Sequence, residues 1–140
     1  MNASMEPVVA LAFWAGLNLL VTLVLALNVT RHRLRAGVAV GAGNDLELER
    51  VVRAHGNNAE YVPGAIVAMT LLALTGTSAL TIHCLGGALL LGRLLHAHGI
   101  HIIGGDAPPP TRVAGNLLTW SVYGISAVAL IASALTQFSG

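Results

Sequence analysis

A long uncharged apolar stretch near the start of the chain constrains the fold more than any other feature. It runs from about Val8 to Val29, and positive charges begin at Arg31. A bilayer core about 30 Å thick needs roughly 20 such residues in one helix. A cleavable secretory signal would carry its positive charges before the apolar stretch and not after it. We therefore expect a membrane-spanning helix here.

Two further apolar regions predict three more helices. Residues 61–95 are too many for one span, and Gly76, followed by a capping residue at Thr77 or Ser78, divides them. The last region follows three prolines at 108–110, which cannot belong to a helix interior. We expect one all-α membrane domain over residues 1–140, an up-down bundle of four transmembrane helices at about 7–30, 45–75, 78–98 and 112–137.

Charged residues make up only 9% of the chain, and the seven basic residues are all arginine. Soluble domains carry roughly a quarter charged residues, and a formal net charge of +1 leaves no basic surface for nucleic acid. The arginines lie in or beside the connections that follow the first and third helices. The positive-inside rule then predicts a multi-pass membrane protein with cytoplasmic charged loops and both termini outside.

The second helix is expected to begin well before its apolar run. Asn44, followed three positions later by Glu47, resembles a capping box, and nearby acidic residues favour a helix N-terminus. A helix from about Asp45 to Thr75 would be about 45 Å long at 1.5 Å per residue. Its first part therefore projects beyond a bilayer core of about 30 Å.

This second helix is also expected to carry a polar face into the membrane. Residues at spacings of four, three and four share one side of it: Arg53, Asn57, Glu60 and Gly64. A carboxylate at membrane depth costs about 2.5–3.5 kcal/mol unless it faces a partner or a water-filled cavity. The face must therefore point into the bundle or toward a neighbouring subunit. It could form a functional site, or it could be a buried Arg–Asn–Glu network that only fixes the helix register. Pro63 is expected to kink the helix nearby.

The segment from Arg53 to Pro63 reads R-A-H-G-N-N-A-E-Y-V-P. It resembles the signature of helix two in the MAPEG superfamily, the membrane-associated proteins of eicosanoid and glutathione metabolism. The resemblance covers essentially the whole chain and implies a microsomal glutathione transferase-like homotrimer with glutathione bound between subunits on the cytoplasmic side. The combination of His96 with Gly99 is more similar to the bacterial branch, which implies the inner membrane.

The resemblance also assigns glutathione contacts on the second helix. The matching residues are Arg53, Asn57, Glu60 and Tyr61, and His55 matches a histidine of the microsomal transferases. Glutathione carries two carboxylates, for which guanidinium groups are the preferred bidentate partners. Its amine needs an acceptor, a role that suits Glu60.

The remaining assignments fall near the third and fourth helices. Arg93 lies in a segment similar to the family's arginine segment and is expected to bind glutathione with His96. In the eicosanoid synthases tyrosines follow that arginine, whereas His96 and Ile100 stand in their places here. Arg112 matches the arginine proposed to stabilise the glutathione thiolate, which makes it the expected catalytic residue.

Two functions remain open at this point. The first is a glutathione-dependent transferase or peroxidase acting on lipophilic electrophiles or lipid hydroperoxides, with glutathione as co-substrate and lipids as partners. The alternative is a non-catalytic lipid- or ligand-binding scaffold. A small proton-coupled exporter is disfavoured because the first helix carries no carboxylate after Glu6. His96, His98 and His101 wrap around a helix end with only Asp106 near them, so no metal is expected.

Several other polar or small residues are predicted to hold the helices together. Asn18 and Thr22 are expected to hydrogen-bond between helices, and His83 is expected to have a structural partner. A stripe of small residues with spacing four on the third helix is expected to let a neighbouring helix approach closely: Cys84, Ala88, Gly92 and His96.

Overall fold

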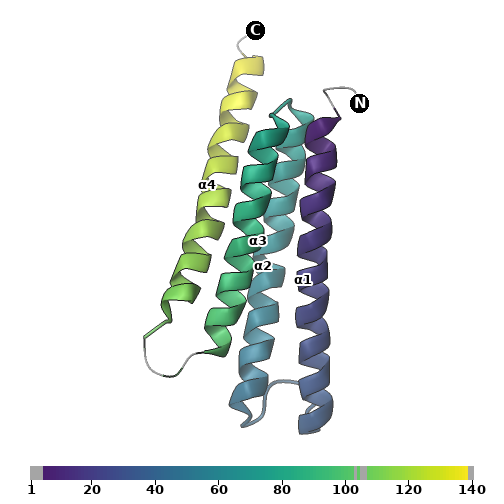
Figure 1. Ribbon diagram of the computed structural model, residues 1–140, viewed down its shortest axis with the longest axis vertical. Helices are drawn as coiled ribbons and strands as arrows, with labels where there is room; N and C mark the ends of the chain where they lie inside the picture. The colour runs from purple at the N-terminus through teal and green to yellow at the C-terminus, as the bar shows by residue number, and fades with distance from the viewer. Residues whose placement is uncertain (1–4, 103, 105–106, 139–140) are drawn as a thin grey trace.

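The computed structural model describes residues 5–102, 104 and 107–138, and these residues form four helices. Their bounds are α1 Glu6–Ala36, α2 Leu46–Leu74, α3 Ala79–His101 and α4 Pro110–Phe138. The helices run alternately in opposite directions along one bundle axis (Figure 1). The predicted all-α four-helix architecture is confirmed.

Among the described helices, α1, α3 and α4 are long and apolar enough to cross a membrane. α2 is less apolar than these three helices, since polar residues such as Asn57, Asn58 and Glu60 lie in its first half. The connectivity agrees with a fourth crossing by α2, which stays a prediction. α2 joins the end of α1 to the start of α3, and these two spans run in the same direction (Figure 1). If α1 and α3 both cross the membrane in this direction, the segment that joins them has to cross back between them.

The boundaries of α1 and α2 correct the predicted ones. α1 continues to Ala36 instead of ending near residue 30. Its arginines end the membrane span but are good helix formers, so the helix stops only at Gly37, which adopts a left-handed conformation with φ 66°. The N-cap of α2 is Asp45 and not Asn44, because the Asp45 side chain accepts hydrogen bonds from two backbone N–H groups of the first turn.

The ends of α3 and α4 follow ordinary capping rules. Ser78 caps α3, as predicted, by accepting a hydrogen bond from the backbone N–H of Thr81. α3 continues to His101, a little beyond the predicted end at residue 98. α4 begins at Pro110 instead of residue 112, since a proline in the first helical position removes only a donor that would have no partner in the helix.

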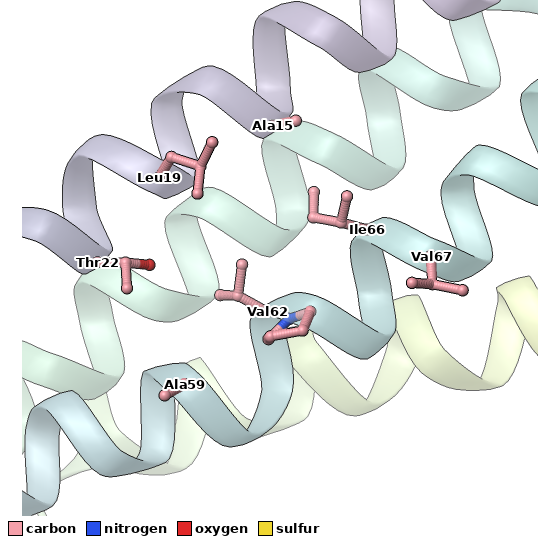
Figure 2. A pocket seen from close by; sticks show the side chains of 8 residues that line it. Ala15, Leu19, Thr22, Ala59, Val62, Ile66 and Val67 are labelled. Atoms are coloured by element: carbon pink, nitrogen blue, oxygen red, sulfur yellow. The ribbon is translucent and has the colours of Figure 1, made fainter.

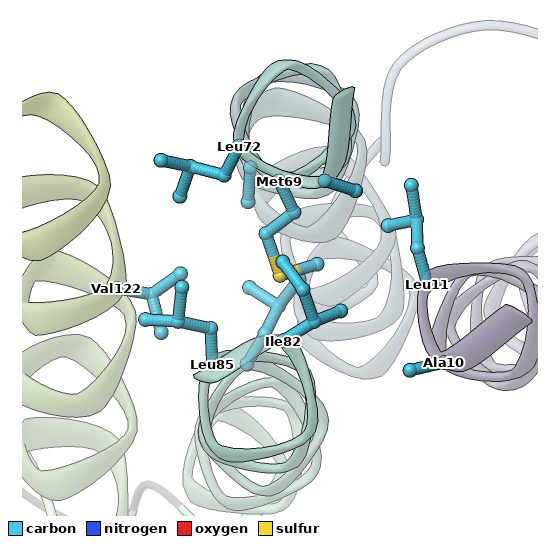
Figure 3. Close-up of a cluster of buried hydrophobic side chains, with 10 residues drawn as sticks. Ala10, Leu11, Met69, Leu72, Ile82, Leu85 and Val122 are labelled. Carbon is cyan, nitrogen blue, oxygen red and sulfur yellow. The ribbon is translucent and has the colours of Figure 1, made fainter. Parts of the chain in front are cut away.

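The main apolar core lies at the end of the bundle away from the arginine-rich connections. Its buried side chains come from all four helices, and Figure 3 shows Met69 of α2 among them. Met69, Ile82 and Leu89 are fully shielded from solvent. This core holds the helices together near the start of α1 and α3, and a smaller apolar cluster around Leu25, Ala54 and Ile100 lies toward the opposite end.

Hydrogen bonds between helices supplement this packing. Asn58 Nδ2 donates to Thr22 Oγ1 at 2.8 Å, and Trp14 Nε1 donates to His83 Nδ1 at 3.0 Å. The predicted roles of Thr22 and His83 are therefore confirmed. Asn18 is fully buried, but its amide donates to the carbonyl of Trp14 on the same helix, so the expected bond to another helix is not formed.

Candidate functional site

A polar cavity of about 330 Å³ lies where α2, α3 and α4 meet at the arginine-rich end of the bundle. We call it the arginine cavity. Its lining combines three guanidinium groups with one carboxylate and two apolar side chains: Leu46, Glu49, Arg50, Arg53, Ile100 and Arg112. The predicted residues Arg53 and Arg112 thus meet in one site although they come from different helices. Such a lining suits a ligand with several negative groups.

A close approach of α3 and α4 positions Arg112 at the start of its helix. A Cβ atom added at Gly99 would lie 2.6 Å from the backbone nitrogen of Arg112. One turn further along α4, a Cβ added at Gly115 would lie 2.6 Å from the carbonyl oxygen of Gly92 and from the backbone nitrogen of His96. Only residues without a side chain allow the two backbones to come this close. The close approach predicted for the stripe of small residues is confirmed at Gly92 and His96, whereas Cys84 at its other end is exposed.

Arg93 lies in a separate buried cluster and does not line the arginine cavity. Its side chain is 2% exposed, and its Nη1 donates to Asn57 Oδ1 at 2.8 Å. The guanidinium carbon lies 5.3 Å from the centre of the Tyr61 ring. Its Nε and Nη2 find no hydrogen-bond partner among the described residues. The buried network on the polar face of α2 therefore joins Arg93, Asn57 and Tyr61.

Tyr123 of α4 completes this cluster, and sequence reasoning did not single it out. Its hydroxyl donates to the carbonyl of Tyr61 at 2.6 Å, and the two rings meet edge to face with centroids 5.9 Å apart. A Cβ added at Gly64 would collide with the same hydroxyl. A single tyrosine on an apolar helix carries no local signal. Only the glycine that makes room for it, at the end of the polar face of α2, could have pointed to a close neighbour.

We predict that Gly64→Ala destabilises the protein mainly through Tyr123. Tyr123→Phe removes one hydrogen bond and should lower the free energy of unfolding by about 1 kcal/mol. Gly64→Ala should cost more in the wild type than in the Tyr123→Phe background, because the phenylalanine ring lacks the colliding oxygen. Unfolding by increasing sodium dodecyl sulfate would measure both costs. Equal costs in the two backgrounds would contradict the contact.

The other predicted site residues lie at different depths. His96 is 2% exposed and does not line the arginine cavity, but the guanidinium groups of Arg53, Arg93 and Arg112 are close enough to act on it electrostatically. His55 is half-buried, and Glu60 is exposed on the surface of the single chain. No ion pair joins Glu60 to another described residue.

The three histidines considered for a metal do not converge. His96 is buried, whereas His98 and His101 are exposed, and Asp106 lies outside the described residues. Within the described part of the chain, no group of three or more His, Cys, Asp or Glu side chains is placed to hold a metal ion.

A second, apolar pocket of about 380 Å³ lies between α1 and α2. Figure 2 shows side chains of the two helices facing each other across it, and Pro63 is part of its wall. α2 continues through Pro63 without ending. The pocket is lined by Ala15, Leu19, Thr22, Ala59, Val62, Pro63, Ile66 and Val67. None of these described residues lines the arginine cavity.

Comparison with known proteins identifies the family to which this chain is similar. Residues 11–132 match the sequence profile of the MAPEG family. The chain is 39% identical over 90 residues to "Inner membrane protein YecN" of Escherichia coli (strain K12), which covers 64% of this chain and 69% of that protein. The same values hold for the protein of that name from Escherichia coli O6:H1. The name of these relatives states a location and no activity. No solved structure matches the chain.

Proposed function

The chain belongs to the MAPEG family, and on that premise we propose that it is a glutathione-dependent transferase or peroxidase embedded in the membrane. The observation that carries this proposal is the arginine cavity, in which Arg50, Arg53 and Arg112 meet Glu49. Glutathione has two carboxylates, an ammonium group and a thiol that reacts as its anion. Three guanidinium groups and one carboxylate complement that pattern of charge.

In the proposed transferase reaction the glutathione thiolate attacks a lipophilic electrophile. A free thiol has a pKa near about 8.5 and is mostly protonated at neutral pH. The Arg112 guanidinium, at the start of α4, favours the anion by its charge and by the helix dipole. With an aryl halide, sulfur bonds to the ring carbon, the halide leaves with the electron pair of its bond, and the thiol proton passes to water.

The peroxidase reaction would use the same thiolate. The sulfur attacks the outer oxygen of a lipid hydroperoxide, the O–O bond breaks, and the lipid alcohol leaves after taking a proton. A second glutathione then displaces water from the oxidised sulfur and forms glutathione disulfide. The balance is one hydroperoxide and two thiols to one alcohol, one water and one disulfide, so no further reductant is needed.

We propose in addition that the active form is a homotrimer whose glutathione sites lie between subunits. Glu60 supports this arrangement because it is exposed in the single chain, on a helix packed between membrane spans. A carboxylate at that depth needs a partner, and a neighbouring subunit with its bound glutathione would supply one. The arginine-rich end of the bundle is the proposed cytoplasmic end, since positive charge favours that side.

Titration calorimetry and a conjugation assay on the detergent-solubilised protein test the proposal. We expect glutathione to bind at millimolar concentration or below, and an aryl halide to be conjugated faster than in buffer alone. S-methylglutathione is the matched control ligand, because it keeps both carboxylates and the amine but cannot form a thiolate. It should bind without supporting turnover. Absence of glutathione binding at millimolar concentration would contradict the proposal.

One observation favours the non-catalytic alternative. The apolar pocket between α1 and α2 is separate from the arginine cavity, so a lipophilic ligand could occupy it without a thiol nearby. Binding of a lipophilic fluorophore that is unaffected by glutathione, together with no conjugation, would support a ligand-binding scaffold.

A further inference from the structure

We propose that a groove between α1 and α3, at the arginine-rich end of the bundle, binds the headgroup of an anionic phospholipid. The groove has a volume of about 410 Å³. Both of its helices are candidate membrane spans, and none of its described lining residues lines the arginine cavity or the apolar pocket. The groove is lined by Val24, Leu25, Leu27, Asn28, Arg31, Ala97, His98 and His101.

One end of the groove is polar and positively charged. Arg31 is the first charged residue after the apolar run of α1, so it marks the level at which the bilayer core ends. His98 and His101, near the end of α3, line the same groove, and all three side chains are exposed. A guanidinium and two imidazoles can all donate N–H groups to phosphate oxygens. Basic pockets between helices at the cytoplasmic side of a membrane bind anionic lipid headgroups in this way.

The other end of the groove is apolar and open. Val24 and Leu27 are 64% and 59% exposed, one to two turns of α1 before Arg31. Leu25 is buried and packs with Ala97 in the smaller apolar cluster, which forms the floor. An acyl chain could therefore lie along the groove while its phosphate reaches the cationic end. This apolar half favours a lipid over a soluble phosphate, which would leave it uncovered.

The charges around the groove favour an anion as well. Among the residues that the structure describes, no carboxylate lines the groove. Glu47, which lies close to this end of α1, is bound by His32 at 3.2 Å and does not line the groove. An alternative role for His98 and His101 is to interact with the carbonyl end of their own helix. That role involves neither Arg31 nor lipid. Variants of arginines on α1 therefore distinguish the helix-end role of the histidines from lipid binding.

Native mass spectrometry on the detergent-purified protein tests this site. We expect dioleoyl phosphatidylglycerol to bind more tightly than dioleoyl phosphatidylcholine, which has the same acyl chains and no net charge. Arg31→Gln should weaken phosphatidylglycerol binding about fivefold and leave phosphatidylcholine binding unchanged. Arg35→Gln is the matched control: it removes the same charge one turn further along α1, outside the groove, and should have less than half of that effect.

The double variant His98→Gln, His101→Gln keeps the test independent of any effect of Arg31 on membrane insertion. It should also weaken phosphatidylglycerol binding and spare phosphatidylcholine binding. Three results would overturn the proposal: equal binding of the two lipids, equal loss in Arg31→Gln and Arg35→Gln, or competition by free glycerol 3-phosphate at the concentration at which the lipid binds. The last result would identify a soluble phosphate as the ligand.

Discussion

Arg112→Ala is expected to lower kcat/KM for glutathione conjugation by up to about 30-fold at pH 7, because a thiol with a pKa of about 8.5 is only about 3% ionised at that pH. Arg112 lines the arginine cavity at the start of α4. Without its guanidinium, the pKa of the bound thiol should return toward that of a free thiol, about 8.5. The thiolate fraction at neutral pH then falls, and the rate falls with it. Glutathione binding should weaken much less, because Arg50 and Arg53 remain.

The pH profile distinguishes this role from a structural one. In the wild type, the rate should stop rising once the pH exceeds the lowered thiol pKa. In Arg112→Ala it should continue to rise through about pH 8.5, so that the difference between the two proteins narrows at alkaline pH. Arg35→Ala, an exposed arginine outside the cavity, is the control and should keep the wild-type profile. A parallel loss of rate at every pH would show that Arg112 does not act on the thiol.

Gly115→Ala is expected to lower the free energy of unfolding by about 3 kcal/mol, at the upper end of the range for overpacking. The added Cβ would lie 2.6 Å from a carbonyl oxygen and a backbone nitrogen of α3, and backbone atoms cannot move aside as a flexible side chain can. The two helices must separate, which also moves Arg112 away from the rest of the cavity. Activity should therefore fall together with stability.

Gly124→Ala on the same helix is the matched control. A Cβ at Gly124 would meet no atom of the described residues within 4 Å, apart from its chain neighbours and the helix's own backbone. Alanine is the better helix former by roughly 1 kcal/mol, so this variant should be neutral or slightly more stable. Thermal unfolding in detergent, with far-ultraviolet circular dichroism as the signal, would compare them. If both substitutions cost the same, the close approach of α3 and α4 does not contribute to stability.

The fold was largely predictable because membrane helices can be recognised in a sequence by their length and apolarity. The stretch that became α1 has few alternatives in a bilayer, and Gly76 marks the turn between α2 and α3. The apolar pattern, however, predicts only the part of a helix that crosses the membrane. The helix itself can continue beyond that part. Arginine favours helices, so α1 continues through the residues that leave the membrane, to Ala36.

The candidate site was predictable only in part. Arg53 and Arg112 meet in one cavity, whereas Arg93 bonds to Asn57 inside the bundle. Helical spacing gives the face on which a residue lies but not which neighbouring helix covers that face. Tyr123 was missed for the same reason. Its partner is a backbone carbonyl on α2, and because every residue has such an acceptor, the sequence does not point to this one.

The contact of Gly99 with the backbone of Arg112 bears on how this family can vary in length. The end of α3 packs directly against the start of α4. The position of Arg112 therefore need not depend on the residues that connect Ile102 to Pro109. Lengthening a connection whose ends are already held together costs little, about 0.6 kcal/mol for each doubling. Insertions and deletions should accumulate between these helices in related chains, while position 99 stays a glycine.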